Sequence, residues 1–174
     1  MKPAAPPSGL LLVRVDNRLV HGQVLEAWLP AIDAQGILVA DDEAARNTLV
    51  RSAMSLAIPP RVTFQVLPVA KAAELLRPGG QGAPSPRTLL LLRDVRDAVA
   101  LARGGVALPK LNLGNVHFAS GRKQVSASVY LDAAEMDALE SLAAAGTVVE
   151  VRAVPNEPPV ALSVLKERFA RGYP

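Results

Sequence analysis

The sequence predicts an α/β fold. We expect a single-domain, three-layer sandwich with a mostly parallel central sheet of about seven strands and an antiparallel strand at one edge. Short apolar runs rich in Leu and Val alternate along the chain with segments of helical periodicity. Strands that alternate with helices are usually joined by right-handed crossovers, which produce a parallel sheet. The run Thr88–Leu92 is almost all leucine, which suits a strand buried on both faces.

The chain length bounds the domain organisation. A chain of 174 residues is long enough for one domain with a sizeable core. We expect residues 10–174 to form that domain and residues 1–9 to be a disordered tail. The tail has three prolines and lacks the apolar centre of a signal peptide. No apolar run approaches the roughly 20 residues that span a bilayer.

The expected strands are apolar runs bounded by turn signals. Val125–Leu131 alternates only in part and is the weakest of them in pattern. The remaining strands are expected at Leu10–Val13, Gly36–Ala40, Val62–Leu67, Thr88–Leu92, Lys110–Leu113 and Val148–Val151.

The expected helices are marked by caps and breakers. Asp94 and Asp132 can accept hydrogen bonds from the first turn of the helices that follow them. Gly146 ends one helix, and Pro59-Pro60 stops another. The helices are expected from Gly22 onward and at Glu43–Leu56, Val69–Leu76, Asp94–Ala102, Ala133–Ala145 and Ala161–Phe169, with a Pro/Gly-rich loop at Arg77–Arg87.

Composition excludes several classes of function. The chain has no cysteine, which rules out disulfides, thiolate metal sites and thiol catalysis, and which fits a reducing cytoplasm. The net charge of +3 comes from 19 basic and 16 acidic residues that are scattered along the chain. No basic block is interleaved with aromatic residues, so we do not expect nucleic-acid binding. No GxGxxG or Walker pattern occurs, which argues against a nucleotide-binding enzyme.

His21 is the strongest candidate for chemistry. It lies after the first expected strand and immediately before the helix that begins at Gly22. This is the carboxyl end of a strand, where open α/β sheets bind ligands. The unpaired N–H groups and the dipole of a helix start favour an anion. A lone histidine before a glycine is more often a surface or core residue, so the neighbouring residues decide its interpretation.

Arg18 makes the phosphoryl-acceptor interpretation of His21 the favoured one. Its guanidinium can contact phosphate oxygens in a bidentate manner. A neutral imidazole is nucleophilic near pH 7. Gly22 has no Cβ and allows close approach of the backbone, and the main-chain N–H groups around Gly22 and Gln23 can donate to a phosphate.

Asp16 and Arg14 are supporting candidates. Asp16 can orient Arg18 or a loop amide; direct contact with a phosphate is disfavoured by charge repulsion. Arg14 lies on the first strand and can pair with an acidic side chain, and we rank it below Arg18.

Asp41, Asp42 and Glu43 follow the second strand and leave alternatives open. Carboxylates at a strand end can bind Mg²⁺, but they can equally cap the next helix, which we favour. A carboxylate here could also approach Arg18 across the end of the sheet.

His117 and Trp28 also have two interpretations. His117 follows a strand and is more consistent with loop structure than with a metal site or a second phosphorylation site, because it has one possible histidine partner and no arginine within three residues. Trp28 can cover the core, which we favour, or face a partner.

The residues from Arg18 to Val24 (RLVHGQV) resemble the active-site loop of the IIB components of the mannose/fructose/sorbose class of the bacterial sugar phosphotransferase system. The resemblance continues in order along nearly the whole chain, in Leu38–Glu43, Pro59–Val62, Leu67–Ala72, Leu111–Phe118 and Val151–Val160. One departure is Asn115, which stands where a second glycine is expected. Asn tolerates positive φ better than most residues, so we expect the turn to persist.

The resemblance implies a function. His21 would accept a phosphoryl group from a phosphohistidine of a separate IIA component and pass it to a sugar taken up by membrane IIC and IID partners. It implies a cytoplasmic location, close to the membrane through those partners, and no cofactor or metal. The alternative is a regulatory module in which the same phosphohistidine switches binding to another protein without sugar transport.

Overall fold

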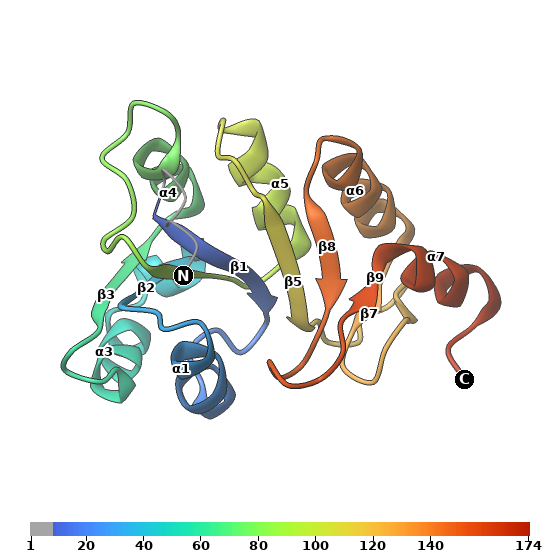
Figure 1. The fold of residues 1–174 in the computed structure, drawn as a ribbon, viewed down its shortest axis with the longest axis horizontal. Helices are drawn as coiled ribbons and strands as arrows, with labels where there is room; N and C mark the ends of the chain where they lie inside the picture. The colour runs from blue at the N-terminus through green and yellow to red at the C-terminus, as the bar shows by residue number, and fades with distance from the viewer. Residues whose placement is uncertain (1–8) are drawn as a thin grey trace.

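The computed structural model describes residues 9–174 and contains a seven-stranded sheet. The strands pair in parallel except for the last, which is antiparallel to its neighbour at the edge. The predicted fold class is therefore confirmed (Figure 1). Of the predicted tail, residues 1–8 lie outside the described part of the chain. In order across the sheet, the strands are β3 (Thr63–Leu67), β2 (Gly36–Ala40), β4 (Thr88–Leu92), β1 (Leu10–Asp16), β5 (Lys110–Asn115), β8 (Val148–Val151) and β9 (Val160–Ala161).

Helices cover both faces of this sheet and complete the three layers (Figure 1). Alternate residues of β4 point to opposite sides: Leu90 and Leu92 enter one core, and Leu89 and Leu91 enter the other. All are fully buried, as expected for a strand between two helical layers. The first core is covered by α4 (Val69–Leu76), α5 (Val95–Arg103) and α6 (Ala133–Ala144), and the second by the helix after β1 together with α2 (Asp42–Arg46) and α3 (Thr48–Ala57).

The helix that follows His21 has an unusual backbone. Gly22 and Gln23 are helical, residues Val24–Trp28 form the π-helix η1, and α1 (Leu29–Ala31) completes it. π-helical turns inside helices are frequent at functional sites. The turn places Val24 and Trp28 in the second core.

The helix caps were predicted correctly from the sequence. Asp94 and Asp132 each form a capping box, with Asp97 and Glu135 respectively. The strands β2, β4 and β8 and the helix α4 have the predicted bounds, and residues 77–87 form a loop. These elements are specified by local patterns.

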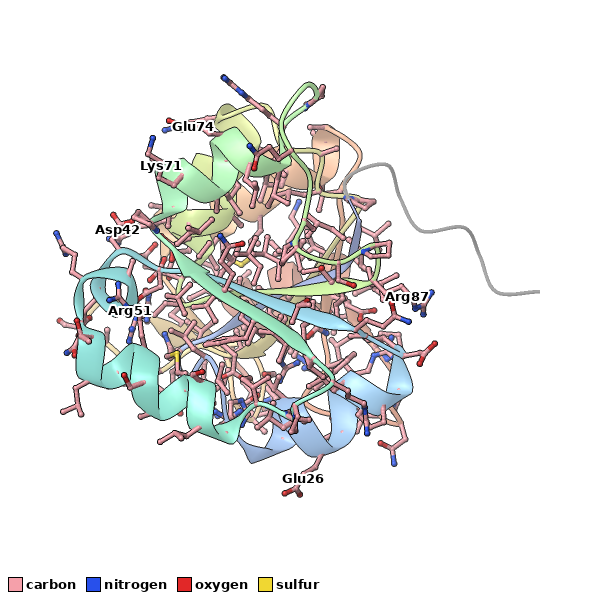
Figure 2. All side chains as sticks on the ribbon, turned by 90° about the vertical axis from the view of Figure 1, so that its left-hand side faces the viewer. Glu26, Asp42, Arg51, Lys71, Glu74 and Arg87 are labelled. Atoms are coloured by element: carbon pink, nitrogen blue, oxygen red, sulfur yellow. The ribbon has the colours of Figure 1, made fainter. Side chains whose placement is uncertain are left out.

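The region predicted as one helix at Glu43–Leu56 is two helices, α2 and α3. They separate at Asn47, whose side chain accepts a hydrogen bond from the Val50 N–H (3.1 Å) and so caps α3. Figure 2 shows Arg51 on α3 near this junction, where it donates to the Ala45 carbonyl. The sequence signal for this break is Asn47, a residue type that often caps helices, inside an otherwise continuous helical pattern.

Two other predictions were wrong in extent. Val125–Leu131 is not one strand: β6 (Lys123–Gln124) and β7 (Tyr130–Leu131) form a separate antiparallel pair with a bend between them. The last helix, α7 (Leu162–Arg171), begins one residue later and extends two residues further than expected.

β1 and β5 continue past their apolar runs to Asp16 and Asn115. Arg14 and Asp16 are fully buried at this end of β1 and form an ion pair with each other. Because the pairing offsets the cost of burying two charges, the strand can include these polar residues. β1 lies between β4 and β5. From β1 the chain continues to β2 on one side of it in the sheet, whereas from β5 it continues to β8 on the other side, so the strand order reverses at β1. Ligands of open α/β sheets bind at the carboxyl end of this position.

Candidate active site

The loop after β1 carries His21. The Leu19 N–H donates to the Asp16 carbonyl (2.9 Å), which closes a tight turn. Leu19 has a φ of 56°, a left-handed conformation that is uncommon for a residue with a side chain, and it is buried in the second core. The His21 carbonyl then accepts from Val24 and Leu25 (both 3.1 Å) and starts the helix. The imidazole therefore lies between an anchored turn and a helix start.

Asp16 is the centre of the polar contacts in this loop. Its Oδ2 accepts from His21 Nε2 (3.0 Å), Arg14 Nη2 (3.1 Å) and Arg18 Nη2 (2.9 Å). Its Oδ1 accepts from Arg18 Nε (3.0 Å) and from the Arg18 main-chain N–H (3.1 Å). Asp16 thus contacts both the Arg18 side chain and a loop amide, and in addition the histidine.

These contacts keep Asp16 ionised. Burial opposes its charge, but the hydrogen bonds from His21 and Arg18 and the positive charge of Arg14 outweigh burial and lower the pKa of Asp16 well below its usual value. The carboxylate is fully buried, whereas 16% of the His21 side chain is exposed. A buried anion therefore faces one edge of a partly exposed imidazole.

The contact with Asp16 defines the two edges of the His21 ring. Nε2 faces the carboxylate, and a carboxylate accepts, so this nitrogen carries the proton. No hydrogen bond from residues 9–174 reaches Nδ1, which carries the lone pair whenever the ring is neutral. A histidine held in this way presents Nδ1 as a nucleophile.

Arg14 is fully buried beside Asp16 and is surrounded by hydrogen-bond acceptors. Nη2 donates to Asp16, to Gln23 Oε1 (3.3 Å) and to the Ala153 carbonyl (3.1 Å). Nη1 donates to the Arg152 carbonyl (2.9 Å) and to Asn112 Oδ1. Burial lowers the pKa of Arg14, and the adjacent Asp16 opposes this effect. From the sequence we ranked Arg14 below Arg18; in the structure Arg14 has more hydrogen-bond partners than Arg18 and connects Asp16 to the segment that follows β8.

The proposed phosphate-binding residues surround His21. Arg18 is 41% exposed, and its Nη2 also donates to Gln23 Oε1 (3.1 Å). Gly22 has open space around the position of a Cβ, with Glu26 Oε1 nearest at 3.9 Å. Packing within the protein therefore does not require a glycine here. The absence of a side chain leaves this side of the loop open to a ligand.

Asn17 was not identified from the sequence. Its N–H donates to the Asn115 carbonyl (3.0 Å), its Nδ2 to the Arg93 carbonyl (2.9 Å), and its Oδ1 accepts from the His117 N–H. One residue therefore joins the loops that follow β1, β4 and β5. A turn-forming Asn after a strand was the available signal, but its partners come from distant segments.

Two of the acidic residues after β2, Asp41 and Asp42, act as caps. Asp41 Oδ1 accepts from the Ala44 N–H (2.7 Å), and Asp42 Oδ1 accepts from the Val69 N–H (2.8 Å). Figure 2 places Asp42 beside the start of α4. Asp41 forms a bidentate pair with Arg93 (2.7 and 2.9 Å). Within residues 9–174 no ion pair joins Arg18 to Asp41, Asp42 or Glu43, but Glu43 approaches Arg18 in the sense that both residues line the same small cavity. In the described part of the chain, no group of three or more His, Asp or Glu side chains could hold a metal ion.

The loop after β5 differs from expectation. Asn115 belongs to β5, and among residues 9–174 only Leu19 and Asp33 combine a side chain with positive φ, so the turn expected at Asn115 is not present. The His117 carbonyl accepts from Arg122 (2.9 Å), while its side chain is exposed. His117 contributes to loop structure through its main chain.

Together, the fold and the loop define an α/β domain that presents a carboxylate-oriented histidine at the carboxyl edge of a parallel sheet. Residues 10–170 match the family model of the sorbose-subfamily IIB component of the phosphotransferase system (PTS). The chain therefore belongs to this family of IIB components. No helix in residues 9–174 has the length and apolar character needed to cross a membrane.

Characterised relatives agree with this assignment. The chain is 31% identical to the N-acetylgalactosamine-specific phosphotransferase enzyme IIB component 2 of Escherichia coli K12, over 88% of this chain and 96% of that protein. It is 33% identical to the mannose-specific EIIAB component of the same strain, over 90% of this chain but only 49% of that longer protein.

A solved structure shares the fold. The IIBSor domain of the sorbose permease from Klebsiella pneumoniae superposes with a TM-score of 0.80 at 29% identity, covering 91% of this chain and 96% of that domain. IIB components are in general phosphotransferases that work with IIA and membrane IIC and IID components.

Proposed function

We propose that this chain is a phosphoryl carrier in which His21 Nδ1 accepts a phosphoryl group from the phosphohistidine of a IIA component and passes it to a sugar during uptake. The observation that carries the proposal is the hydrogen bond between His21 Nε2 and the buried carboxylate of Asp16 (3.0 Å). It holds a proton on Nε2 and leaves the lone pair of Nδ1 available for attack.

In the first step, the bond between phosphorus and the donor histidine breaks as a bond between phosphorus and His21 Nδ1 forms. The Nε2 proton stays in its hydrogen bond to Asp16, so the carboxylate offsets the positive charge that develops on the ring. Phosphoryl transfer has a loose in-line transition state, and the protein contributes mainly positioning and charge stabilisation.

Arg18 and the helix start would stabilise the phosphoryl oxygens. The Arg18 guanidinium is 41% exposed and donates to the same Asp16 carboxylate as His21, so it lies close to the ring that would carry the phosphoryl group. The N–H groups of Gly22 and Gln23 begin the helix and favour an anion. Arg14, which is fully buried, keeps Asp16 in place rather than reaching the phosphate.

In the second step, the bond between phosphorus and Nδ1 breaks as a sugar hydroxyl attacks. The hydroxyl proton passes to a base of the acceptor complex. We propose that a separate IIA protein is the donor and that a membrane IIC/IID permease holds the sugar, with this chain at the cytoplasmic face. These partners are supported by the relatives, one of which is named a IIB component and another an EIIAB component, in which IIA and IIB parts belong to one protein. We also propose that residues 10–174 act as one domain.

The test is phosphorylation by labelled phosphoenolpyruvate, the general phosphotransferase proteins and a IIA donor. We expect acid-labile, alkali-stable label on the wild type and none on His21→Ala. His117→Ala is the matched control, because His117 is the only other histidine of the chain, and we expect it to be labelled normally. Label on His21→Ala would contradict the assignment of His21. Label on the wild type without transfer to any sugar, given membranes that contain the permease, would favour the regulatory alternative.

A further inference from the structure

Trp28 connects the histidine helix to the segment that follows β8. It lies at the end of η1, is 3% exposed and is the only tryptophan of the chain. Its Nε1–H donates to the Ala153 carbonyl (2.9 Å). The same carbonyl accepts from Arg14 Nη2 (3.1 Å). One main-chain oxygen is therefore shared by the tryptophan and by the arginine that holds Asp16.

Two guanidinium groups lie over the indole ring. The Cζ atom of Arg14 is 4.9 Å from a ring centroid of Trp28, and that of Arg152 is 5.8 Å away. Both distances are within the range of a cation–π interaction, which is strongest for tryptophan and for desolvated cations. Arg14 is fully buried and Arg152 is 19% exposed, so water does not weaken these contacts as it would at a surface.

The ring also explains the unpaired groups of the cluster. The Nε atoms of Arg14 and Arg152 are both buried and have no hydrogen-bond partner among the described residues. A buried N–H without an acceptor is costly, and two in one cluster need a compensating interaction. The electron-rich face of Trp28 is the group that both arginines share, and an aromatic face can take the place of an acceptor.

We propose that Trp28 is a positioning residue for phosphoryl transfer: its ring holds Arg14 and Arg152, and Arg14 in turn holds Asp16 and His21. The inference rests on the proposed carrier function of His21. The connection is a short series of contacts, from the ring to Arg14 (4.9 Å), from Arg14 to Asp16 (3.1 Å) and from Asp16 to His21 (3.0 Å). It goes beyond core packing, which needs only an apolar side chain of similar volume.

Two substitutions separate these roles. Trp28→Leu keeps an apolar side chain but removes the aromatic face and the N–H donor. Trp28→Phe keeps an aromatic face and removes only the donor. Leu29→Ala is the matched control: Leu29 is the next residue of the same helix, is buried in the same core and forms no hydrogen bond with either arginine.

The structural measurement is the ¹H–¹⁵N spectrum of the arginine side chains, which does not depend on phosphoryl transfer. In the wild type we expect the Nε–H signals of Arg14 and Arg152 to be shifted upfield by the ring and protected from solvent exchange. Trp28→Phe and Leu29→Ala should keep this signature, and Trp28→Leu should lose it. Ordinary shifts of both signals in the wild type would overturn the proposal, even if the leucine variant does not fold.

The functional measurement is the single-turnover rate of phosphoryl transfer from a charged IIA donor. Loss of one desolvated cation–π contact corresponds to a rate decrease of about tenfold or more, and we expect this for Trp28→Leu. Trp28→Phe and Leu29→Ala should stay within about threefold of the wild type. A folded Trp28→Leu variant that transfers at the wild-type rate would overturn the positioning role. If instead the wild type shows the shifted and protected arginine signals but accepts no phosphate, the proposed carrier function of His21 is contradicted. The placement of the two arginines against Trp28 would still stand.

Discussion

The guanidinium of Arg14 occupies the space that a side chain at Gly114 would need. A Cβ at position 114 would lie 2.0 Å from Arg14 Nη2 and 2.1 Å from Arg14 Cζ. Atoms cannot approach so closely, and Arg14 cannot move without leaving Asp16 and the carbonyl groups of residues 152 and 153. The glycine on β5 is therefore required by an arginine on β1.

We predict that Gly114→Ala displaces Arg14 and impairs both stability and transfer. Overpacking and the loss of buried hydrogen bonds should lower the free energy of unfolding by about 2 kcal/mol or more. Gly22→Ala makes the same chemical change where a Cβ has open space, so its free energy of unfolding should stay within about 0.5 kcal/mol of the wild type. Urea denaturation of both variants checks this difference. Equal free energies of unfolding of the two variants would contradict the prediction, because they would mean that Arg14 can move away from a Cβ at position 114 at little cost.

Asp16→Asn tests the buried anion. The asparagine keeps the shape of the side chain but leaves Arg14 buried without its countercharge, which should cost about 3 kcal/mol at pH 7. The folded-state pKa of Asp16 is lowered, so its stabilising effect is present above the unfolded value of 3.8 and is lost as the pH falls below it.

The measurement is the free energy of unfolding of the wild type and of Asp16→Asn from pH 7 to pH 3. The difference between the two proteins should be largest at neutral pH and should shrink toward pH 3. A difference that does not change with pH would mean that the charge of Asp16 contributes nothing to folding. Transfer to His21 should also be lost at neutral pH, because Nε2 no longer faces a carboxylate.

Asp97 should have the opposite dependence on pH. Burial, and then the negative charge of Asp94, raise the pKa of Asp97 to about 6. The folded protein therefore binds a proton more tightly than the unfolded chain, and the contribution of Asp97 to stability is lost as the pH rises from about 4 to about 6.

We predict that Asp97→Asn stabilises the protein by about 1 kcal/mol at pH 7.5. The asparagine oxygen can still accept the hydrogen bond from the Asp94 N–H (3.2 Å), so the capping box is kept while the charge is removed. Thermal unfolding at pH 7.5 and pH 4.5 measures the effect, which should be present at the higher pH and small at the lower one. A lower melting temperature at pH 7.5 would contradict the prediction.

Arg18→Ala should separate catalysis from folding. The Arg18 side chain is 41% exposed, so its removal should change the free energy of unfolding by less than about 1 kcal/mol. The rate of phosphoryl transfer to His21 should fall by about 100-fold, the usual effect of losing one donor to a developing charge. Arg18→Lys should restore little of the rate because an ammonium lacks the bidentate fork.

The control for Arg18→Ala is Arg96→Ala. Arg96 is 73% exposed and pairs with Asp132 at 3.6 Å. Its variant removes an arginine at the start of α5, and its transfer rate should equal that of the wild type. Similar losses of rate in the two variants would point to a general charge effect rather than to contact between Arg18 and the phosphoryl group.

The sequence by itself determined the elements that depend on neighbouring residues and the position of the loop that carries His21. The apolar run Thr88–Leu92 became β4, and Asp94 and Asp132 became N-caps, because an apolar period or a capping side chain acts within a few residues. The motif around His21 indicated the family, which the match over residues 10–170 confirms. It also indicated that His21 follows the end of a strand, and the structure places it after β1.

Only the tertiary structure decided how the site is supported. Arg14 lies against Gly114, against Asn112 and below Trp28, and these residues come from β5 and η1. Asn17 joins loops that follow three different strands, and the carbonyl of Ala153 is shared with Trp28. Apart from the contact between Arg14 and Trp28, these contacts link residues 76 to 125 positions apart. No local pattern encodes them, because they form only when parallel strands bring their carboxyl ends to the same edge of the sheet.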